Sequence, residues 1–242
     1  MILGTLFTAL GYIVGICVFY LRAREKQLAT QGFGYLAAAG FGGGILGAKL
    51  TQWLVAQPQV LLHQPEALLG AHSGGRTLLG GVIFGWVSIE LAKGRLGIRR
   101  SSGDLFALAL PAGEAVGRIG CFFHACCHGI TGDAAWACYQ HGQWRHPVQL
   151  YSALYSGALF ILLWVWRDRL RHEGRLFALY LMSFGTGRFV LEFWRAHEGE
   201  LPTFSTAQWL CLVLVAVGAT LWRRCLSHHD KAAAVADERI RI

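Results

Sequence analysis

Two pairs of opposite charges stand inside stretches of sequence that are otherwise apolar. Glu114 and Arg118 are four residues apart, and so are Arg188 and Glu192. Residues at this spacing share one face of an α-helix, so each pair can form an ion pair within one helical turn. Such pairs can be self-neutralising structural contacts. Alternatively, the two guanidinium groups face a common cavity, where their planar arrays of donors would bind a phosphate.

Glycines beside both arginines favour the binding alternative. Arg118 stands between Gly117 and Gly120, and Arg188 follows Gly187. Because glycine has no side chain, it lets another group approach a helix closely. Ionisable residues inside membrane spans usually mark a functional site. In a bilayer the available phosphate belongs to a phospholipid, so we expect Arg118 and Arg188 to bind a lipid phosphate.

Residues 118–151 hold a second concentration of reactive side chains. They include four of the seven cysteines and four of the ten histidines: Cys121, Cys126, Cys127, Cys138, His124, His128, His141 and His146. Cysteine and histidine are common metal ligands, although this spacing is not a standard zinc pattern. A disulfide within the cluster would use Cys121 or Cys138, because the other two cysteines are adjacent. The remaining interpretation is free thiols beside histidines that act as acids or bases.

The composition indicates that these residues are positioned by membrane helices. The chain is 54% hydrophobic and only 15% charged, with a mean hydropathy of +0.41. Soluble domains average about 25% charged residues, so the composition argues against an ordinary cytosolic enzyme. Apolar runs of about 20 residues predict membrane spans. We therefore predict an all-α integral membrane protein with seven transmembrane helices: 3–21, 33–55, 78–92, 104–123, 148–166, 176–194 and 206–222.

The lysines and arginines between the spans predict an orientation. Sixteen of the 22 lie in four alternate connecting segments: 22–30, 93–100, 167–175 and 223–242. The other three connecting segments hold one each: Arg76, Arg145 and Arg195. Basic residues collect on the cytoplasmic side of membrane proteins. The N-terminus is therefore expected outside and the C-terminus in the cytoplasm, and the net charge of +8 reflects topology rather than nucleic-acid binding.

This orientation organises the chain into one polytopic transmembrane domain and a short tail. The transmembrane domain covers residues 1–227 and carries a small outer segment at 124–147, whereas residues 228–242 form a polar cytoplasmic tail. Both span arginines then lie toward the outer half of the membrane.

Several stretches resemble the bacterial prolipoprotein diacylglyceryl transferase family. They are GRIGCF at 117–122, HPVQLY at 146–151, FGTGRFVLEFWR at 184–195, STAQWL at 205–210 and, more weakly, GGRTLLGG at 74–81. These stretches run in order over residues 74–218. The resemblance implies seven crossings of the bacterial cytoplasmic (inner) membrane with the N-terminus outside.

The resemblance also implies an activity. It implies transfer of a diacylglyceryl group from phosphatidylglycerol to the thiol of a lipoprotein-precursor cysteine, or to a related acceptor. We expect no cofactor, no metal and no nucleic acid. Arg118 and Arg188 would be catalytic, because fixed positive charge stabilises a phosphate leaving group. The expected substrate-binding residues are Glu114, Gly117, Gly120, Cys121, Gly129, Gln149, Tyr151, Glu192, Arg195 and Tyr12.

The chain departs from the family pattern at several polar positions. Leu79 stands where well-known members carry histidine, and Phe184 stands where tyrosine is expected. Cys121, His124 and Cys126 replace the asparagines and glutamate that usually follow the first arginine motif. The usual base and several polar partners are therefore replaced.

These departures leave the base and the acceptor open. We expect His124, His128 or His146 to act as the catalytic base, because they lie beside the arginine motif. Two other classes of function remain as alternatives. One is a lipid-binding membrane relative without turnover, and the other is a metal or thiol-redox membrane protein that uses the Cys/His cluster at 121–146.

Overall fold

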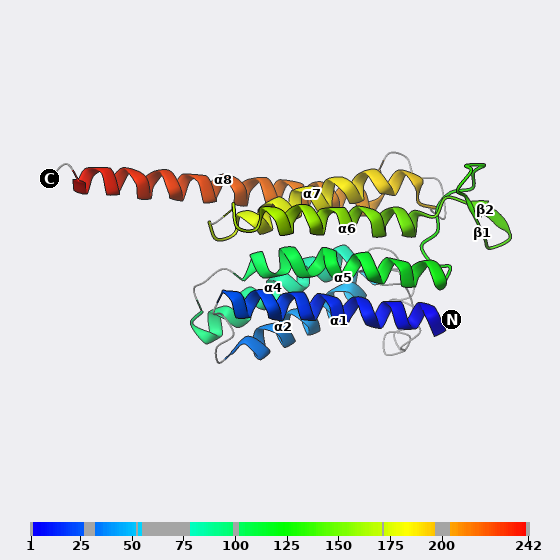
Figure 1. Ribbon diagram of the computed structural model, residues 1–242, viewed down its shortest axis with the longest axis horizontal. Helices are drawn as coiled ribbons and strands as arrows, with labels where there is room; N and C mark the ends of the chain where they lie inside the picture. The colour runs from blue at the N-terminus through cyan, green and yellow to red at the C-terminus, as the bar shows by residue number, and fades with distance from the viewer. Residues whose placement is uncertain are drawn as a thin grey trace. The chain divides into compact units, whose positions relative to one another are not determined.

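The computed structural model describes residues 2–26, 32–51, 53–54, 78–98, 102–170, 172–196 and 204–240. Seven α-helices account for most of them: α1 (Ile2–Glu25), α2 (Phe33–Thr51), α4 (Leu78–Leu96), α5 (Gly103–Phe123), α6 (Val148–Trp166), α7 (Arg175–Leu191) and α8 (Thr206–Ile240) (Figure 1). A short antiparallel hairpin joins α5 to α6 and consists of β1 (Cys138–Gln140) and β2 (Gln143–Arg145). A 3-10 turn, η3 (Glu192–Trp194), extends α7.

Five of these helices are long and apolar enough to cross a membrane. They are α1, α5, α6, α7 with η3, and the Thr206–Leu226 part of α8. Their surfaces carry large exposed hydrophobic side chains such as Leu154 and Ile161, 74% and 63% exposed, a surface suited to lipid rather than to water. The predicted spans at 33–55 and 78–92 fall on α2 and α4. Within the described residues, neither of these two helices is among the five that meet the criterion of length and composition.

Contacts divide the chain into two compact units, residues 1–25 with 101–242 and residues 26–100. In the smaller unit, α2 packs against α4 through glycines. A Cβ atom at Gly47 would stand 2.1 Å from Cβ of Phe84, and one at Gly43 would stand 2.0 Å from Oγ of Ser88. Small residues at a helix–helix contact are typical of membrane proteins, because they let two backbones approach closely.

The larger unit uses the same device where α1 packs on α5. A Cβ atom at Gly11 would stand 2.7 Å from the carbonyl oxygen of Gly113. A Cβ atom at Gly120 would stand 2.6 Å from Oγ1 of Thr8. Further contacts join α5 to α6, α6 to α7 and α7 to α8, so α5, α6 and α7 are mutual neighbours. The charged side chains of α5 and α7 can therefore meet.

Polar side chains fix the beginnings of α7 and α8. Asp104 of α5 is 3% exposed and accepts hydrogen bonds of 3.0 Å from the backbone N–H groups of Gly174 and Phe177. Ser205 and Gln208 form a capping box, in which Gln208 N–H donates to Oγ of Ser205 at 3.1 Å and Ser205 N–H donates to Oε1 of Gln208 at 2.8 Å. These caps satisfy N–H groups that a helix leaves without partners in its first turn.

Helix α8 continues well beyond the predicted end of its span. The expected span ends at residue 222, whereas α8 runs to Ile240. Residues 228–240 of the expected polar tail are therefore helical and continuous with the last span. The alanines and charged residues of this segment favour helix, which explains the continuation.

Candidate active site

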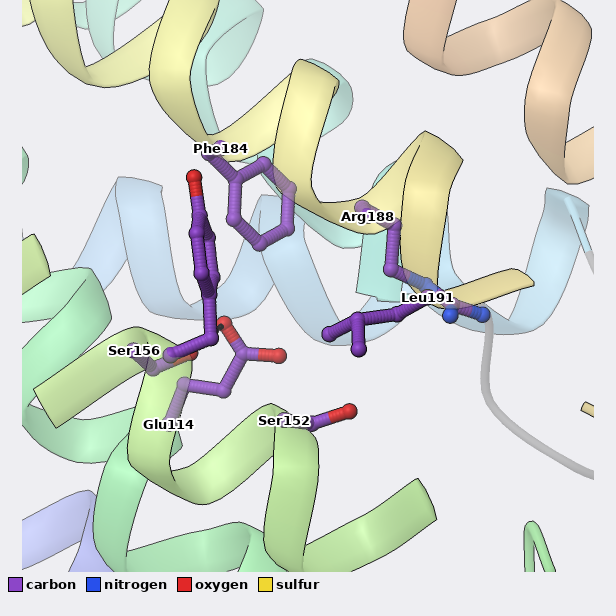
Figure 2. Close-up of a pocket in the computed structure, with 7 residues that line it drawn as sticks. Glu114, Ser152, Ser156, Phe184, Arg188 and Leu191 are labelled. Atoms are coloured by element: carbon purple, nitrogen blue, oxygen red, sulfur yellow. Dashed lines mark hydrogen bonds between the residues drawn. The ribbon is translucent and has the colours of Figure 1, made fainter. Parts of the chain in front are cut away.

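A small pocket lies among α5, α6 and α7 in the larger unit. Its volume is about 10 Å³, about the space that one water molecule needs. The lining combines a carboxylate, a guanidinium, three hydroxyls and two apolar side chains (Figure 2): Glu114, Ser152, Tyr155, Ser156, Phe184, Arg188 and Leu191. One member of each predicted ion pair thus faces the same space, although 74 residues separate Glu114 from Arg188 in sequence.

The first ion pair forms as the spacing predicts. Nε and Nη2 of Arg118 lie 3.0 Å and 2.9 Å from Oε1 of Glu114. Oε2 of Glu114 accepts a 3.0 Å hydrogen bond from the hydroxyl of Ser156 on α6. Both carboxylate oxygens are therefore engaged, and Glu114 joins Arg118 to the pocket that Arg118 itself does not line.

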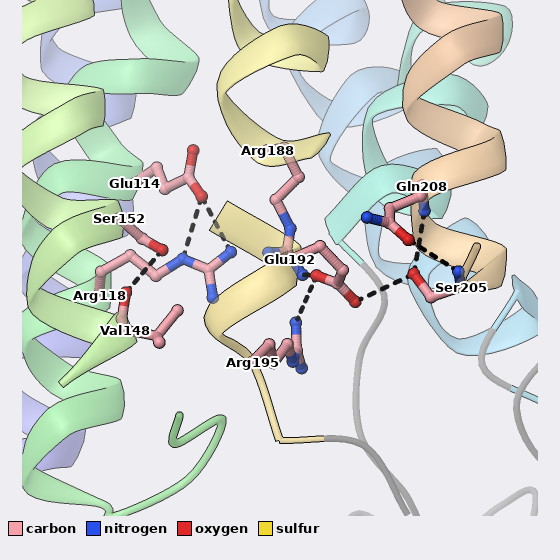
Figure 3. Close-up of polar contacts among 9 residues, drawn as sticks. All are labelled: Glu114, Arg118, Val148, Ser152, Arg188, Glu192, Arg195, Ser205 and Gln208. Carbon is pink, nitrogen blue, oxygen red and sulfur yellow. Dashed lines mark hydrogen bonds and ion pairs between the residues drawn. The ribbon is translucent and has the colours of Figure 1, made fainter. Parts of the chain in front are cut away.

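The second ion pair also forms, and its carboxylate is shared more widely. Nη2 of Arg188 lies 2.5 Å from Oε2 of Glu192, and the two side chains are only 7% and 4% exposed. The same oxygen lies 3.9 Å from Nη1 of Arg195, while Oε1 accepts a 3.4 Å hydrogen bond from the hydroxyl of Ser205 (Figure 3). Glu192 thus holds two guanidinium groups and contacts the N-cap of α8.

The charges of this site do not cancel. Three arginines face two glutamates, so the group carries one positive charge in excess when all five side chains are ionised: Glu114, Arg118, Arg188, Glu192 and Arg195. A phosphodiester carries one negative charge. Electrostatic attraction is strong in a buried site of low dielectric constant, so the group is suited to bind a monoanionic phosphodiester.

Helix α6 contributes polar residues that the sequence analysis did not single out. Ser152, Tyr155 and Ser156 line the pocket, and the Tyr155 hydroxyl donates a 2.5 Å hydrogen bond to the carbonyl oxygen of Ser183 on α7. The sequence does carry a signal for them. Gln149, Ser152 and Ser156 recur at helical spacing in an otherwise apolar span, which indicates a polar face turned toward the protein interior.

The glycines beside the arginines mostly admit other parts of the protein. A Cβ atom at Gly187 would stand 2.0 Å from Cζ of Tyr155, so this glycine makes room for an aromatic ring of α6. Gly120 makes room for α1, and Gly185 makes room for α8 at the carbonyl oxygen of Cys211. At Gly117 a Cβ atom would meet no described atom within 4 Å. Close helix packing therefore explains Gly120 and Gly187, which we expected to admit a ligand.

The segment at 124–147 folds over the ends of α5 and α7. Gly129 N–H donates to the carbonyl oxygen of His146 at 3.1 Å, and Ile130 N–H donates to that of Trp194 at 2.9 Å. A Cβ atom at Gly129 would stand 2.4 Å from the His146 oxygen and 2.8 Å from the Trp194 oxygen. Gly129 therefore allows this segment to bridge to Arg195, next to the second ion pair.

The three histidines expected to supply a base lie in different surroundings, and none of them lines the pocket. The ring of His124 packs against Gly4 of α1. Nδ1 of His146 lies 3.1 Å from the Tyr151 hydroxyl. Nδ1 of His128 lies 3.5 Å from Nη1 of Arg145. Partial burial and the positive charge of Arg145 lower the pKa of His128, so its imidazole is neutral at pH 7.

Two of the expected substrate-binding residues, Gln149 and Tyr151, hold the 124–147 segment in place, and Tyr12 lies away from the pocket. Gln149 is 1% exposed, and its Nε2 donates to the carbonyl oxygen of Cys126 at 2.8 Å and to Oε1 of Gln140 at 3.2 Å. The Tyr151 hydroxyl accepts a 2.7 Å hydrogen bond from the indole of Trp136. Tyr12 lies on α1, is exposed and does not line the pocket.

All seven cysteines are free thiols. Cys121, Cys126 and Cys127 lie together at the end of α5, whereas the Cys138 thiol contacts the carbonyl oxygen of Trp136 at 3.8 Å. Within the described part of the chain, no group of three or more His, Cys, Asp or Glu side chains has a geometry that could hold a metal ion.

Helices of membrane-spanning length around a buried arginine–glutamate ion pair define a multi-pass membrane protein. The chain belongs to the prolipoprotein diacylglyceryl transferase family, whose model matches residues 5–224. A phosphatidylglycerol–prolipoprotein diacylglyceryl transferase of Aromatoleum aromaticum is 34% identical over 237 residues, 88% of each chain. The protein of the same name from Azoarcus sp. (strain BH72) is 32% identical over 88% of this chain and 87% of its own. That of Clostridium tetani is 29% identical over 87% of both chains.

Proposed function

We propose that this protein transfers the diacylglyceryl group of phosphatidylglycerol to the thiol of a lipoprotein-precursor cysteine. The observation that carries the proposal is the partly buried group of three arginines and two glutamates, which lies inside the region matched by the family model. Its excess of one positive charge is complementary to the single negative charge of the phosphatidylglycerol phosphodiester.

The reaction forms one bond and breaks one. The acceptor sulfur attacks the terminal glyceryl carbon, the bond from that carbon to the phosphate oxygen breaks, and glycerol phosphate leaves with the bonding electrons. Negative charge grows on the phosphate oxygen as the bond breaks, so guanidinium donors fixed beside it lower the barrier. Arg188 lines the pocket and is the primary donor, while Arg118 and Arg195 supply charge from either side.

The glutamates position these arginines. A buried guanidinium without a partner would be costly, so Glu114 and Glu192 keep Arg118 and Arg188 charged and oriented when no lipid is bound. The pocket is smaller than a phosphate group, so lipid binding requires side chains to move. Phe184, Arg188 and Leu191 line it from α7, so displacement of these side chains would enlarge it.

The acceptor thiol must lose its proton when it attacks, and His128 is the best-supported base among the three histidines. Its lowered pKa keeps the ring nitrogen free to accept a proton at pH 7. It also lies in the segment that is hydrogen-bonded to the end of α7, since its carbonyl oxygen accepts from Ala196 N–H at 3.2 Å. His124 and His146 are the second candidates.

The proposed setting is the bacterial cytoplasmic (inner) membrane, crossed seven times with the N-terminus outside. The alternation of basic and basic-poor connecting segments supports this orientation. It would put the 124–147 segment on the outer side, where phosphatidylglycerol of the outer leaflet and a membrane-tethered precursor would both have access.

Complementation of a bacterium depleted of its own prolipoprotein diacylglyceryl transferase tests the proposal. We expect the wild-type chain to restore growth and precursor lipidation, the Arg188→Ala variant to fail, and the Arg118→Ala variant to restore lipidation less completely. Arg24→Ala is the matched control, because Arg24 is an exposed arginine of α1 outside the site. Purified protein that transfers no label from phosphatidylglycerol to a lipobox peptide would refute the proposal.

The base is tested in the same purified assay with His128→Ala, His124→Ala and His146→Ala. We expect His128→Ala to slow transfer about 100-fold, within the range that a general base contributes, and the other two to retain most activity. Full activity in all three variants would exclude histidine as the base.

A further inference from the structure

Three thiols meet where α5 ends, and the proposed transfer gives them no role. The helix closes in a Schellman motif, with Cys126 N–H bonded to the Cys121 carbonyl oxygen at 3.2 Å and Ala125 N–H bonded to that of Phe122 at 3.0 Å. In this motif the side chains at the positions of Cys121 and Cys126 pack against each other. The Cys126 thiol indeed lies 3.6 Å from the Cys121 carbonyl oxygen. The backbone of this helix end therefore brings the Cys126 thiol against residue Cys121.

The third thiol is that of Cys127, which follows Cys126 directly. Cys127 adopts a left-handed backbone conformation with φ of 57°, and Ala125 does so with φ of 51°. Neither residue is glycine, so both conformations cost free energy, and such strain is often found at functional sites. The thiols of Cys121 and Cys126 both act on the ionisation of Cys127, so the three side chains belong to one cluster.

The surroundings make one of the three sulfurs the reactive one. Hydrogen bonds from Cys121 and Cys126, together with the guanidinium groups of Arg195 and Arg118, lower the pKa of Cys127 below its ordinary value. Hydrogen bonds to the neighbouring thiols raise the pKa of Cys126. The thiolate is the nucleophilic form of cysteine, so Cys127 is the sulfur that attacks first. Neither Cys127 nor Cys121 is fully buried, and Cys126 is exposed.

We propose that Cys121, Cys126 and Cys127 form a thiol–disulfide exchange site that reacts with a disulfide-bearing molecule. The sulfur of Cys127 attacks the incoming disulfide, forms a mixed disulfide and releases one thiol. The sulfur of Cys121 then attacks the Cys127 sulfur of that mixed disulfide, forms the Cys121–Cys127 bond and releases the second thiol. The incoming disulfide is reduced to two thiols, and the two protein thiols supply both electrons and both protons.

Cys121 resolves the mixed disulfide because the other cysteines are poorly placed. Cys126 is adjacent to Cys127, and a ring closed between neighbouring residues strains the backbone. Cys138 lies outside the cluster, with its thiol on the Trp136 carbonyl oxygen. The thiol of Cys126 instead donates to the Cys121 carbonyl oxygen.

The test uses the full-length protein in detergent and oxidised glutathione as the disulfide, with intact mass and alkylation of free thiols as readouts. We expect the wild type and Cys126→Ser to lose two thiols without keeping glutathione. Cys121→Ser should stop at a glutathione adduct on Cys127, and Cys127→Ser should keep its other thiols free. Cys138→Ser is the matched control and should behave as the wild type. None of these masses depends on transfer activity, so they remain interpretable if the transferase proposal fails.

Two results would overturn the inference. One is Cys127→Ser forming a disulfide as fast as the wild type, which would give the first attack to another sulfur. The other is Cys126→Ser, rather than Cys121→Ser, accumulating the glutathione adduct, which would assign the second step to Cys126. A circular-dichroism spectrum of each variant that matches the wild type excludes misfolding as the cause.

Discussion

The two halves of the arginine site hold their charges in different ways. On the α5–α6 side, Glu114 engages one arginine and one serine, and both of its oxygens have a close partner. On the α7–α8 side, Glu192 is shared by Arg188, Arg195 and Ser205, with contacts from 2.5 to 3.9 Å. The first half is a neutral closed unit, and the second carries the excess positive charge.

This difference assigns separate tasks to the two halves. A neutral closed pair gains little from an added anion, because its guanidinium already has a carboxylate at hydrogen-bonding distance. The α7–α8 half has two guanidinium groups for one carboxylate, so a phosphate can take over part of the contact that Glu192 makes with these guanidinium groups. We therefore expect substitutions on α7 to reduce transfer more than the equivalent substitutions on α5.

Replacement of the pocket arginine should have the largest effect. Arg188→Ala removes the donor that lines the pocket and leaves Glu192 with the more distant Arg195. We expect kcat for lipid transfer to fall at least 100-fold, the usual size for loss of a donor to developing negative charge. Arg188→Lys should recover only part of it, because lysine lacks the planar fork. The assay is transfer of labelled diacylglyceryl to a lipobox peptide, with Arg24→Ala as control.

Comparison of the activity losses of Arg118→Ala and Arg188→Ala tests whether the two halves differ. A smaller loss than that of Arg188→Ala, about tenfold, is expected because Arg118 acts through Glu114 rather than from the pocket wall. Equal losses in the two variants would show that the halves act as one unit.

Substitutions of the two glutamates should reduce kcat in the same order, α7 before α5, with smaller effects. Glu192→Gln removes the charge that holds two guanidinium groups, and we expect kcat to fall about tenfold. Glu114→Gln should cost about threefold, since an amide oxygen still accepts from Arg118 and the Ser156 hydroxyl can accept from the new amide N–H. A larger loss for Glu114→Gln than for Glu192→Gln in the transfer assay would reverse the assignment of tasks.

The sequence predicts much of this arrangement because ion pairs within a helix obey a local rule. The spacing of four residues is enough to place Glu114 against Arg118 and Arg188 against Glu192. Hydropathy likewise locates the helices that carry them, since a span must be apolar. Both predictions depend only on residues within a single helix.

Contacts between different helices could not be predicted from the sequence. That Tyr155 fills the space beside Gly187 depends on how α6 packs on α7, and a single sequence carries no record of that packing. Similarly, the Glu192–Ser205 contact joins residues on either side of the segment 197–203. This segment lies outside the described residues, and so do residues 74–77 of the weakest family motif. The three histidines share a short segment, yet tertiary contacts give each ring a different partner.

Substitutions of two glycines test whether helix packing or ligand access explains the glycines of the arginine motifs. Gly187→Ala would place a methyl group 2.0 Å from Cζ of Tyr155, and Tyr155 would have to leave the pocket wall. We expect about 1–3 kcal/mol of destabilisation and several-fold slower transfer. Gly117→Ala meets open space and should preserve stability. Thermal unfolding in detergent compares the two, and equal unfolding midpoints would contradict the packing explanation.

The smallest effects on transfer should come from the helix caps, and they again separate the two regions. Asp104→Ala removes the cap of α7 far from the ion pairs, so we expect about 1–2 kcal/mol of lost stability and unchanged kcat. Ser205→Ala removes a cap of similar strength, but this hydroxyl also donates to Glu192. Its kcat should therefore fall about twofold, the size of a weak hydrogen bond. If both variants lost stability and neither lost activity, the Ser205–Glu192 contact would have no part in holding the arginines.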